Sequence, residues 1–270
     1  MFVDQVEFHG DNPLTESQRA DLAKKIQAQS FVLTPEDAQD SWAIEATEVI
    51  VRGTLQDLGY LKVVPQGTPF LIRATEHELY YALGIEMQSR PQYRLGTVRF
   101  VSTRDAPPAF ADSLLRSQLE LKTGDLFSAS KVRLAMENIT RLYVSKGYLD
   151  MVPEPQTDFY EDDSHIDLTF RIDEGQLYRI RSIDLFAGDA TSRQLSLPQS
   201  KGEPIDPNLW RRFFEANQSH FIAGAKFDWS VRFTRNPTES AVGVVVDFQA
   251  CPEPRLPPES IPTLATRTPI

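Results

Sequence analysis

The sequence predicts an α+β protein made of tandem βααββ units, each a three-stranded sheet with two helices on one face. The first indication is a repeated phrase: "GTLQDLGYLKVVP" and "RLYVSKGYLDMVP" both end a helical pattern at a Gly-Tyr pair. The second indication is a short strand pattern that opens each unit. The third is a longer run of alternating residues that closes it. Self-similarity of this kind is typical of a repeat protein.

Three short strands open the units, at "VDQVEFHG", "LGTVRFVS" and "IRSIDLFA". Three longer runs close them with apolar residues at every second position, which favours strands with one buried face. We expect the closing strands to be central in their sheets because they are the most regular. Their alternating residues are Leu79, Tyr81, Leu83, Ile85 and Met87, then Ile166, Leu168, Phe170 and Ile172, then Val242, Val244, Val246 and Phe248.

Helical spacing lies between the opening and closing strands. Thr15 and Gln18 form a capping-box pattern at the start of the first helix. Gly59 and Gly147 stand where a second helix would end, since glycine reaches the left-handed conformation without a Cβ penalty. We expect the following tyrosines to begin the second strands. Two apolar stripes mark these second helices: Ile44, Val51, Leu55 and Leu58, then Val132, Ala135, Ile139 and Leu142.

The repeat divides the chain into units 1–92, 93–177 and 178–251, followed by a Pro-rich tail, 252–270, that we expect to be disordered. The third unit is degenerate because "NQSHFIAGA" replaces the Gly-Tyr phrase. The junctions "RPQYRLGTVRF" and "EGQLYRIRSIDL" contain no Gly/Ser linker. We therefore expect consecutive units to pack semi-rigidly.

Composition excludes several classes of function. The net charge of −10 and the absence of a basic stripe argue against nucleic-acid binding. One cysteine, Cys251, excludes an internal disulfide, and the four histidines lack a partner at ligand spacing, so we expect no metal. The acidic run Glu161–Asp163 is interpreted as a hairpin tip. With no catalytic constellation and no cofactor motif, we expect no enzyme and no cofactor.

The second unit resembles the POTRA (polypeptide-transport-associated) domains. The resemblance rests on "YRLGTVRF", "LKTGDLFSASKVRLAMENITRLYVSKGYLD" and "IDLTFRIDEGQLYRI". The first unit matches through "EATEVIVRGTLQDLGYLKVVP" but lacks the Gly-Asp-x-Phe helix entry, and the third retains only "KGEPIDPNLW". The residues of structural importance in this pattern are Gly59, Tyr60, Gly124, Gly147, Tyr148 and Gly175.

The resemblance implies a periplasmic scaffold that binds extended polypeptide clients and assists outer-membrane protein assembly or secretion. It also implies an outer-membrane barrel or lipoproteins as further partners. The alternative is a structural envelope or cell-division scaffold attached to the inner membrane. The chain contains no apolar run long enough to span a bilayer, so we expect any export signal to be encoded outside this chain.

A client would bind most directly at a sheet edge, where unpaired backbone groups can accept an added strand. We expect edges at Tyr60–Pro65, Tyr148–Pro155 and Phe227–Phe233. Proline interrupts the first two edges. Either these prolines protect the edge against aggregation and no client binds there, or a client binds in spite of them. The third edge has no proline and is the better candidate. The candidate binding residues are Leu149, Asp150, Met151, Phe227, Asp228, Trp229, Ser230, Val231, Arg232 and Phe233, and a groove beside Trp210 is the alternative.

Overall fold

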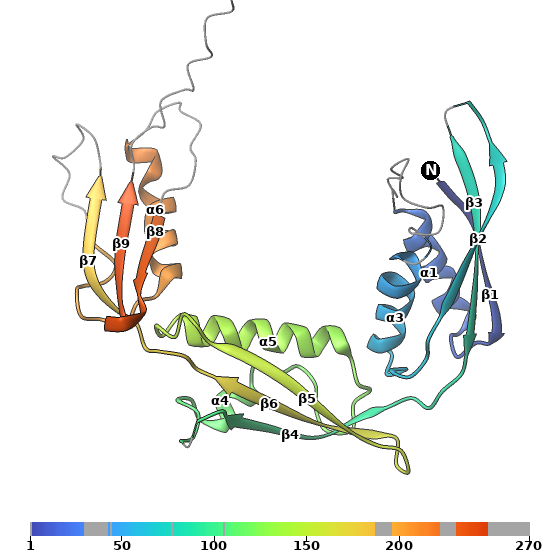
Figure 1. Ribbon diagram of the computed structural model, residues 1–270, viewed down its shortest axis with the longest axis horizontal. Helices are drawn as coiled ribbons and strands as arrows, with labels where there is room; N and C mark the ends of the chain where they lie inside the picture. The colour runs from blue at the N-terminus through green and yellow to red at the C-terminus, as the bar shows by residue number, and fades with distance from the viewer. Residues whose placement is uncertain are drawn as a thin grey trace, which may run out of the picture. The chain divides into compact units, whose positions relative to one another are not determined.

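The computed structural model describes residues 2–29, 43, 45–76, 78–104, 106–186, 196–221 and 231–247. These residues form three three-stranded sheets with one topology, in the orders β1-β3-β2, β4-β6-β5 and β7-β9-β8 (Figure 1). In each sheet the central strand is parallel to the opening strand and antiparallel to the second one. The α+β fold class and the central position of the closing strands are thus confirmed.

The first sheet is covered by helices on one face. Leu22 and Ile26 on α1 and Val51 and Leu55 on the second helix are buried against alternate residues of the central strand. The second helix begins with a π-helical turn, and Ile44 lies outside the described residues. The elements are β1 (Phe2–Asp11), α1 (Glu16–Gln27), η1 (Ala46–Val51), α3 (Arg52–Asp57), β2 (Gln66–Ala74) and β3 (Leu79–Gln88).

The second sheet has the most regular core. All four alternating residues of its central strand are fully buried, and they pack against Val132, Ala135 and Ile139 of the long helix α5. Tyr143 completes the buried stripe of this helix, while Leu142 is only partly buried. The elements are β4 (Arg94–Ser102), α4 (Asp112–Arg116), α5 (Ala129–Val144), β5 (Val152–Tyr160) and β6 (His165–Asp173).

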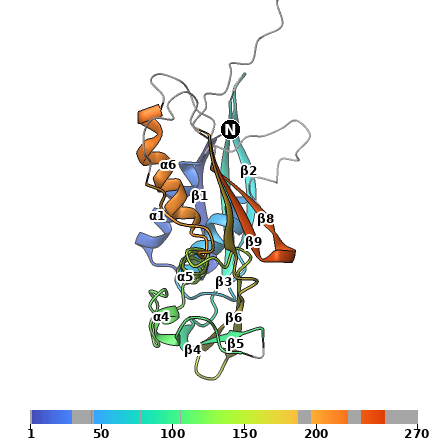
Figure 2. The same cartoon turned by 90° about the vertical axis from the view of Figure 1, so that its left-hand side faces the viewer.

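The third sheet carries one described helix, α6, which lies to one side of β8 and β9 in Figure 2. Trp210 on α6 is fully buried, and its indole N–H donates to Gln199 Oε1 at 3.1 Å. It is therefore a core residue, and the alternative of a groove beside it remains a prediction. The expected first helix of this unit and Phe248 lie outside the described residues. The elements are β7 (Arg179–Phe186), α6 (Pro207–Phe221), β8 (Val231–Asn236), η3 (Pro237–Glu239) and β9 (Ala241–Asp247).

The Gly-Tyr phrase ends a helix, as expected, but does not begin a strand. Gly59 and Gly147 have φ of +83° and +93°, and the N–H groups of the next residues donate back to Leu55 O (2.9 Å) and Tyr143 O (3.2 Å). This six-to-one hydrogen bond is the Schellman cap. The expectation that each tyrosine starts the second strand is wrong, because β2 begins at Gln66 and β5 at Val152. The cap uses the tyrosine N–H, so a turn must follow before the chain can extend.

Contacts between residues divide the chain into two compact units. One comprises residues 1–144 and 148–175, and the other comprises residues 145–147 and 176–270. The first therefore holds two of the three sheets, and the second holds the third. The domain boundaries expected from the repeat remain a prediction.

Candidate functional site

The edges of the sheets are the candidate sites because each sheet has two outer strands that are paired on one side only. The outer strands are β1 and β2, β4 and β5, and β7 and β8. The edges predicted from the sequence were only the second strands of the units, so the opening strands are additional edges. An edge can accept a client strand only where its outward backbone groups are unoccupied.

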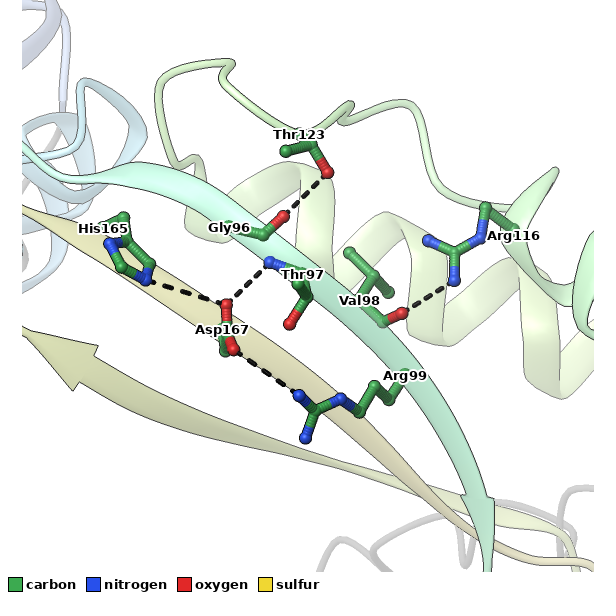
Figure 3. A network of polar contacts seen from close by, with 8 residues as sticks. All are labelled: Gly96, Thr97, Val98, Arg99, Arg116, Thr123, His165 and Asp167. Carbon is green, nitrogen blue, oxygen red and sulfur yellow. Dashed lines mark hydrogen bonds and ion pairs between the residues drawn. The ribbon is translucent and has the colours of Figure 1, made fainter.

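The β4 edge is covered at its start by the segment that leads into α5. Leu95 N–H donates to Asp125 O at 2.9 Å, and Leu95 O accepts from Gly124 N–H at 2.7 Å. The Thr123 hydroxyl donates to Gly96 O at 2.8 Å (Figure 3). The expected structural role of Gly124 is thus located, at φ +91°, in the turn that pairs with this edge.

An arginine covers the next outward carbonyl of β4. Arg116, in the last turn of α4, donates to Val98 O at 2.7 Å (Figure 3). Its guanidinium also lies 5.8 Å from the centre of the Phe100 ring. Asp112, one turn earlier on the same helix, holds this guanidinium at 3.3 Å. The first half of β4 is therefore occupied by its own unit and offers little to a client strand.

A carboxylate fixes the irregular pairing between β4 and β6. The ladder shifts between Leu95 and Val98, and Asp167 Oδ1 accepts the Thr97 N–H at 2.7 Å (Figure 3). This hydrogen bond, together with His165 at 4.0 Å and Arg99 at 3.9 Å, lowers the pKa of the Asp167 carboxyl. The Asp167 side chain is 14% exposed and that of Arg99 is 66% exposed, so the carboxylate is the shielded member of this network.

Proline interrupts the β5 edge. The ladder with β6 is continuous from Val152 to Tyr160, and both Pro153 and Pro155 lie within it. In an antiparallel ladder, every second residue donates its N–H to the partner strand. Because proline has no N–H, the residues that alternate with the prolines must donate to β6. The backbone groups at the proline positions therefore face the open edge. The outward donors left on this strand are Thr157 and Phe159. The expected interruption of this edge by proline is therefore consistent with the register.

Three of the candidate binding residues precede β5 rather than belonging to it. Leu149 and Asp150 lie in the turn after the helix cap, and Met151 is 5% exposed in the core. Gly175 faces the same turn, because a Cβ on it would lie 2.8 Å from the Cβ of Asp150. The expected edge at Tyr148–Pro155 is thus displaced toward Tyr160, since the Schellman cap delays the strand.

The first-unit edge is also displaced. Pro65 precedes β2, and Pro69 is the proline that lies inside the strand, opposite Leu83. By the parity argument used for β5, Pro69 removes an outward donor. Three consecutive apolar residues near the end of β2 are about half exposed: Phe70, Leu71 and Ile72.

The β8 edge is the one predicted to be most accessible. Val231–Asn236 pairs with β9 in a regular antiparallel register and contains no proline. Val231 and Phe233 are half-buried and Arg232 is exposed, which agrees with the alternation expected from the sequence. The remaining candidates of this edge, Phe227, Asp228, Trp229 and Ser230, lie outside the described residues.

Glu174, the residue that follows β6, carries a buried carboxylate. Its Oε1 accepts from the Tyr143 hydroxyl at 2.9 Å and from the Ala109 N–H at 2.5 Å. Burial, and then the hydrogen bond to Glu174, raise the pKa of Tyr143 well above its usual range. The carboxylate thus joins α5 to the loop before α4. The local Asp-Glu-Gly pattern carries no signal of these distant partners.

Within the part of the chain that the structure describes, no three acidic, histidine or cysteine side chains gather as metal ligands would. In the same residues, no helix has both the length and the apolar character that crossing a membrane requires.

Comparison with known proteins agrees with this architecture. A family model for POTRA, described as "Surface antigen variable number repeat", matches residues 93–175. A search of curated proteins finds no match. The crystal structure of Haemophilus influenzae BamA POTRA3-5 superposes with a TM-score of 0.59 at 15% identity, covering 91% of this chain and 96% of that one.

Two further solved structures are less similar. POTRA1-3 of the periplasmic domain of Omp85 from Anabaena has a TM-score of 0.40 at 14% identity, covering 91% of this chain and 94% of that one. BamA from Haemophilus ducreyi lacking POTRA domains 1-3 has a TM-score of 0.46 at 18% identity, covering 66% and 30%. The family match identifies residues 93–175 as a POTRA domain, and the three sheets together share the fold of three consecutive POTRA domains.

Proposed function

We propose that the chain is a periplasmic scaffold that binds extended polypeptides at a sheet edge and assists outer-membrane protein assembly or secretion. The observation that carries this proposal is the contrast among edges. The start of β4 is hydrogen-bonded to its own unit and β5 is interrupted by proline, whereas β8 is a continuous strand without proline. An extended client would add to β8 mainly through backbone hydrogen bonds, so clients of varied sequence can bind.

The likeness to solved structures supports this proposal at the level of fold. The three repeats superpose on three consecutive POTRA domains of Haemophilus influenzae BamA, and the family match lies in the second repeat. A barrel or lipoproteins would then be further partners of this chain. Strand addition uses only backbone donors and acceptors, so the binding proposed needs no cofactor.

One observation favours a second candidate, a structural scaffold of the envelope or of cell division. Edges are commonly protected by charged residues, and exposed Arg232 and Arg235 lie on β8 itself. If these arginines serve only to prevent strand addition, the array would position partners without capturing extended clients.

A crosslinking experiment separates the two candidates. Photoreactive residues are placed at the exposed positions Thr234 on β8 and Gln156 on β5 of the full chain. The probe is a nine-residue peptide of alternating valine and threonine with a lysine at each end. We expect several-fold more crosslinked probe at position 234 than at 156, because proline removes two outward donors on β5.

A gain-of-binding variant serves as the control. Pro153→Thr with Pro155→Thr restores two outward N–H groups on β5 and should raise crosslinking at position 156. Equal yields at both positions in the unmodified chain, with no rise in the double variant, would contradict strand addition and favour the structural scaffold.

A further inference from the structure

A carboxylate from the first POTRA-like unit sits at the start of the principal helix of the second. Asp57 is the last residue of α3, and its Oδ1 accepts from the Ser130 N–H at 2.7 Å and from the Ser128 hydroxyl at 3.0 Å. Ser130 is the second residue of α5. The two helices belong to different sheets but to the same compact unit.

This contact has the chemistry of a helix N-cap. The first turn of any α-helix leaves N–H groups without an internal partner, and an oxygen that accepts one of them stabilises the helix by about 1 kcal/mol. Ser128 caps α5 locally by accepting from Lys131 N–H at 3.3 Å. Asp57 accepts the neighbouring N–H and adds a negative charge, which the positive end of the helix dipole favours.

A second contact joins the same two units through the tip of the β5–β6 hairpin. Glu161 accepts from the Tyr93 hydroxyl at 2.7 Å and is paired with Lys62, which follows the helix cap of the first unit. The Lys62 ammonium also lies 5.1 Å from the centre of the Phe159 ring. Glu161, interpreted from the sequence as part of a solvated tip, is thus engaged in holding the joint.

The backbone between the two contacts is itself fixed. Tyr93 N–H donates to Gly59 O at 2.9 Å, and Gln92 Nε2 donates to Leu58 O at 2.7 Å. A Cβ on Gly59 would come within 2.7 Å of Tyr93 O, so only glycine fits this approach. The carbonyls left free by the end of α3 are therefore used by the two residues at the junction of the units.

We propose that Asp57 is a cap in trans, which makes helix α5 of the second unit complete only when the first unit is folded and docked. Lys62 and Glu161 close the same joint from the hairpin side. Separating the two units would leave the Ser130 N–H uncapped and two charges unpaired. These two contacts hold the joint from both sides, so separation of the two units and unfolding of the start of α5 occur together.

The third unit provides an internal contrast. The start of α6 carries its own carboxylate, since Asp206 Oδ1 accepts from the Asn208 N–H at 2.9 Å. The position of Ser128 before α5 corresponds to that of Asp206 before α6, two residues ahead of the capped N–H. In the second unit this position holds a serine, and the preceding unit supplies the aspartate. The start of α5 therefore depends on that unit.

The test uses hydrogen exchange in the full chain. In Asp57→Ala, amides in the first turn of α5 should exchange about five-fold faster, the change that loss of roughly 1 kcal/mol produces. Asp57→Asn keeps an oxygen acceptor and should restore most of the protection. Asp21→Ala, which removes an exposed acidic residue of α1, should leave α5 unchanged.

A second variant tests the same cap by moving its carboxylate to the local position. In the Asp57→Ala chain, Ser128→Asp supplies the carboxylate as in the third unit and should restore most of the protection of the first turn. Unchanged exchange of the first turn in Asp57→Ala, or no recovery in Asp57→Ala with Ser128→Asp, would overturn the proposal. A change that also appears in Asp21→Ala would show that only net charge matters and would overturn it as well.

Discussion

The second and third sheets share one topology, yet their outer strands differ in what they leave open. In the second sheet, backbone groups of β4 are hydrogen-bonded to Thr123, Gly124 and Arg116, and prolines occupy the outward positions of β5. In the third sheet, Ile180 of β7 is likewise hydrogen-bonded to Gly202 and Glu203, but β8 is continuous and without proline. A fold common to both units therefore does not decide which backbone groups of an edge are occupied. A few side chains at the edges decide it.

The same two sheets also differ at the irregular point of their parallel ladders. In the second sheet, Asp167 is the central-strand residue at the register shift. In the third sheet, Gly243 occupies the corresponding position, opposite Ser182. The glycine lies on the floor of a shallow hollow on the open face of the third sheet, which Ser182, Asp184 and Thr234 also line. At this point the second sheet carries a charged side chain, and the third sheet has a hollow.

The largest expected effect comes from Gly96→Ala. A Cβ at this position would overlap Asp167 Oδ1 and lie 2.8 Å from His165 Cδ2, so we expect a loss of about 2 kcal/mol in the second unit. Arg181 stands at the corresponding bulge of β7 and already carries a side chain, so Arg181→Ala should change the third unit little. Hydrogen exchange of peptides from each opening strand measures both effects.

A double variant tests whether Asp167 is the source of this crowding. Asp167→Gly places the residue of the third sheet in the second, and it should relieve much of the overlap in Gly96→Ala. If the double variant is as unstable as the sum of the two single ones, the crowding does not involve Asp167, and the contrast between the two ladders fails.

A smaller effect is expected from the charge of Asp167. Its pKa is lowered from the ordinary value of 3.8, chiefly by Thr97, so its contribution is fully present above that value and lost as the pH falls through the folded value. Asp167→Asn should therefore be less stable than the unmodified chain at neutral pH, and the difference should shrink progressively as the pH falls below about 4. Thermal unfolding as a function of pH measures it.

The third sheet supplies the control for this pH dependence. Gly243→Asn introduces an amide at the corresponding position of the third sheet without adding a titratable group. It should therefore shift stability equally at all pH values. A difference between Asp167→Asn and the unmodified chain that persists unchanged below about pH 3 would contradict the role assigned to the carboxylate.

The smallest expected effect comes from Arg116→Ala. The guanidinium is about half exposed, so loss of its hydrogen bond to Val98 O should cost below about 1 kcal/mol. The functional consequence should be clearer than the energetic one, since the β4 edge gains an open carbonyl. Crosslinking of the valine–threonine probe near Val98 should rise in Arg116→Ala and stay low in Arg116→Lys, which retains a donor.

Most of the fold was predictable because it follows local rules. Alternating apolar residues predicted the three central strands, and Gly59 and Gly147 predicted helix ends that the structure has as Schellman caps. The errors are also local in origin. The strands after these caps begin several residues later than expected, since the tyrosine N–H is used in the cap and Met151 is drawn into the core.

The site was less predictable than the fold. The predicted interruption of the β5 edge rests on Pro153 and Pro155, which lie in its ladder, and it could be argued from sequence because the missing N–H is a property of the residue itself. Nothing local in the sequence indicated that Arg116 reaches a carbonyl of β4 or that Glu174 receives the Tyr143 hydroxyl. These contacts join residues that are distant in the chain, so only the packed arrangement defines them.

The amino-acid sequence alone specifies the repeat, the order of strands and helices, and the resemblance to POTRA domains, because backbone preference and hydrophobic period are written residue by residue. Packing decides which edges are occupied, that Asp57 completes a helix of the next unit, and that Asp167 braces a ladder. An acceptor stabilises a donor only at hydrogen-bond distance. That distance is set by how the elements pack and not by their spacing in the sequence.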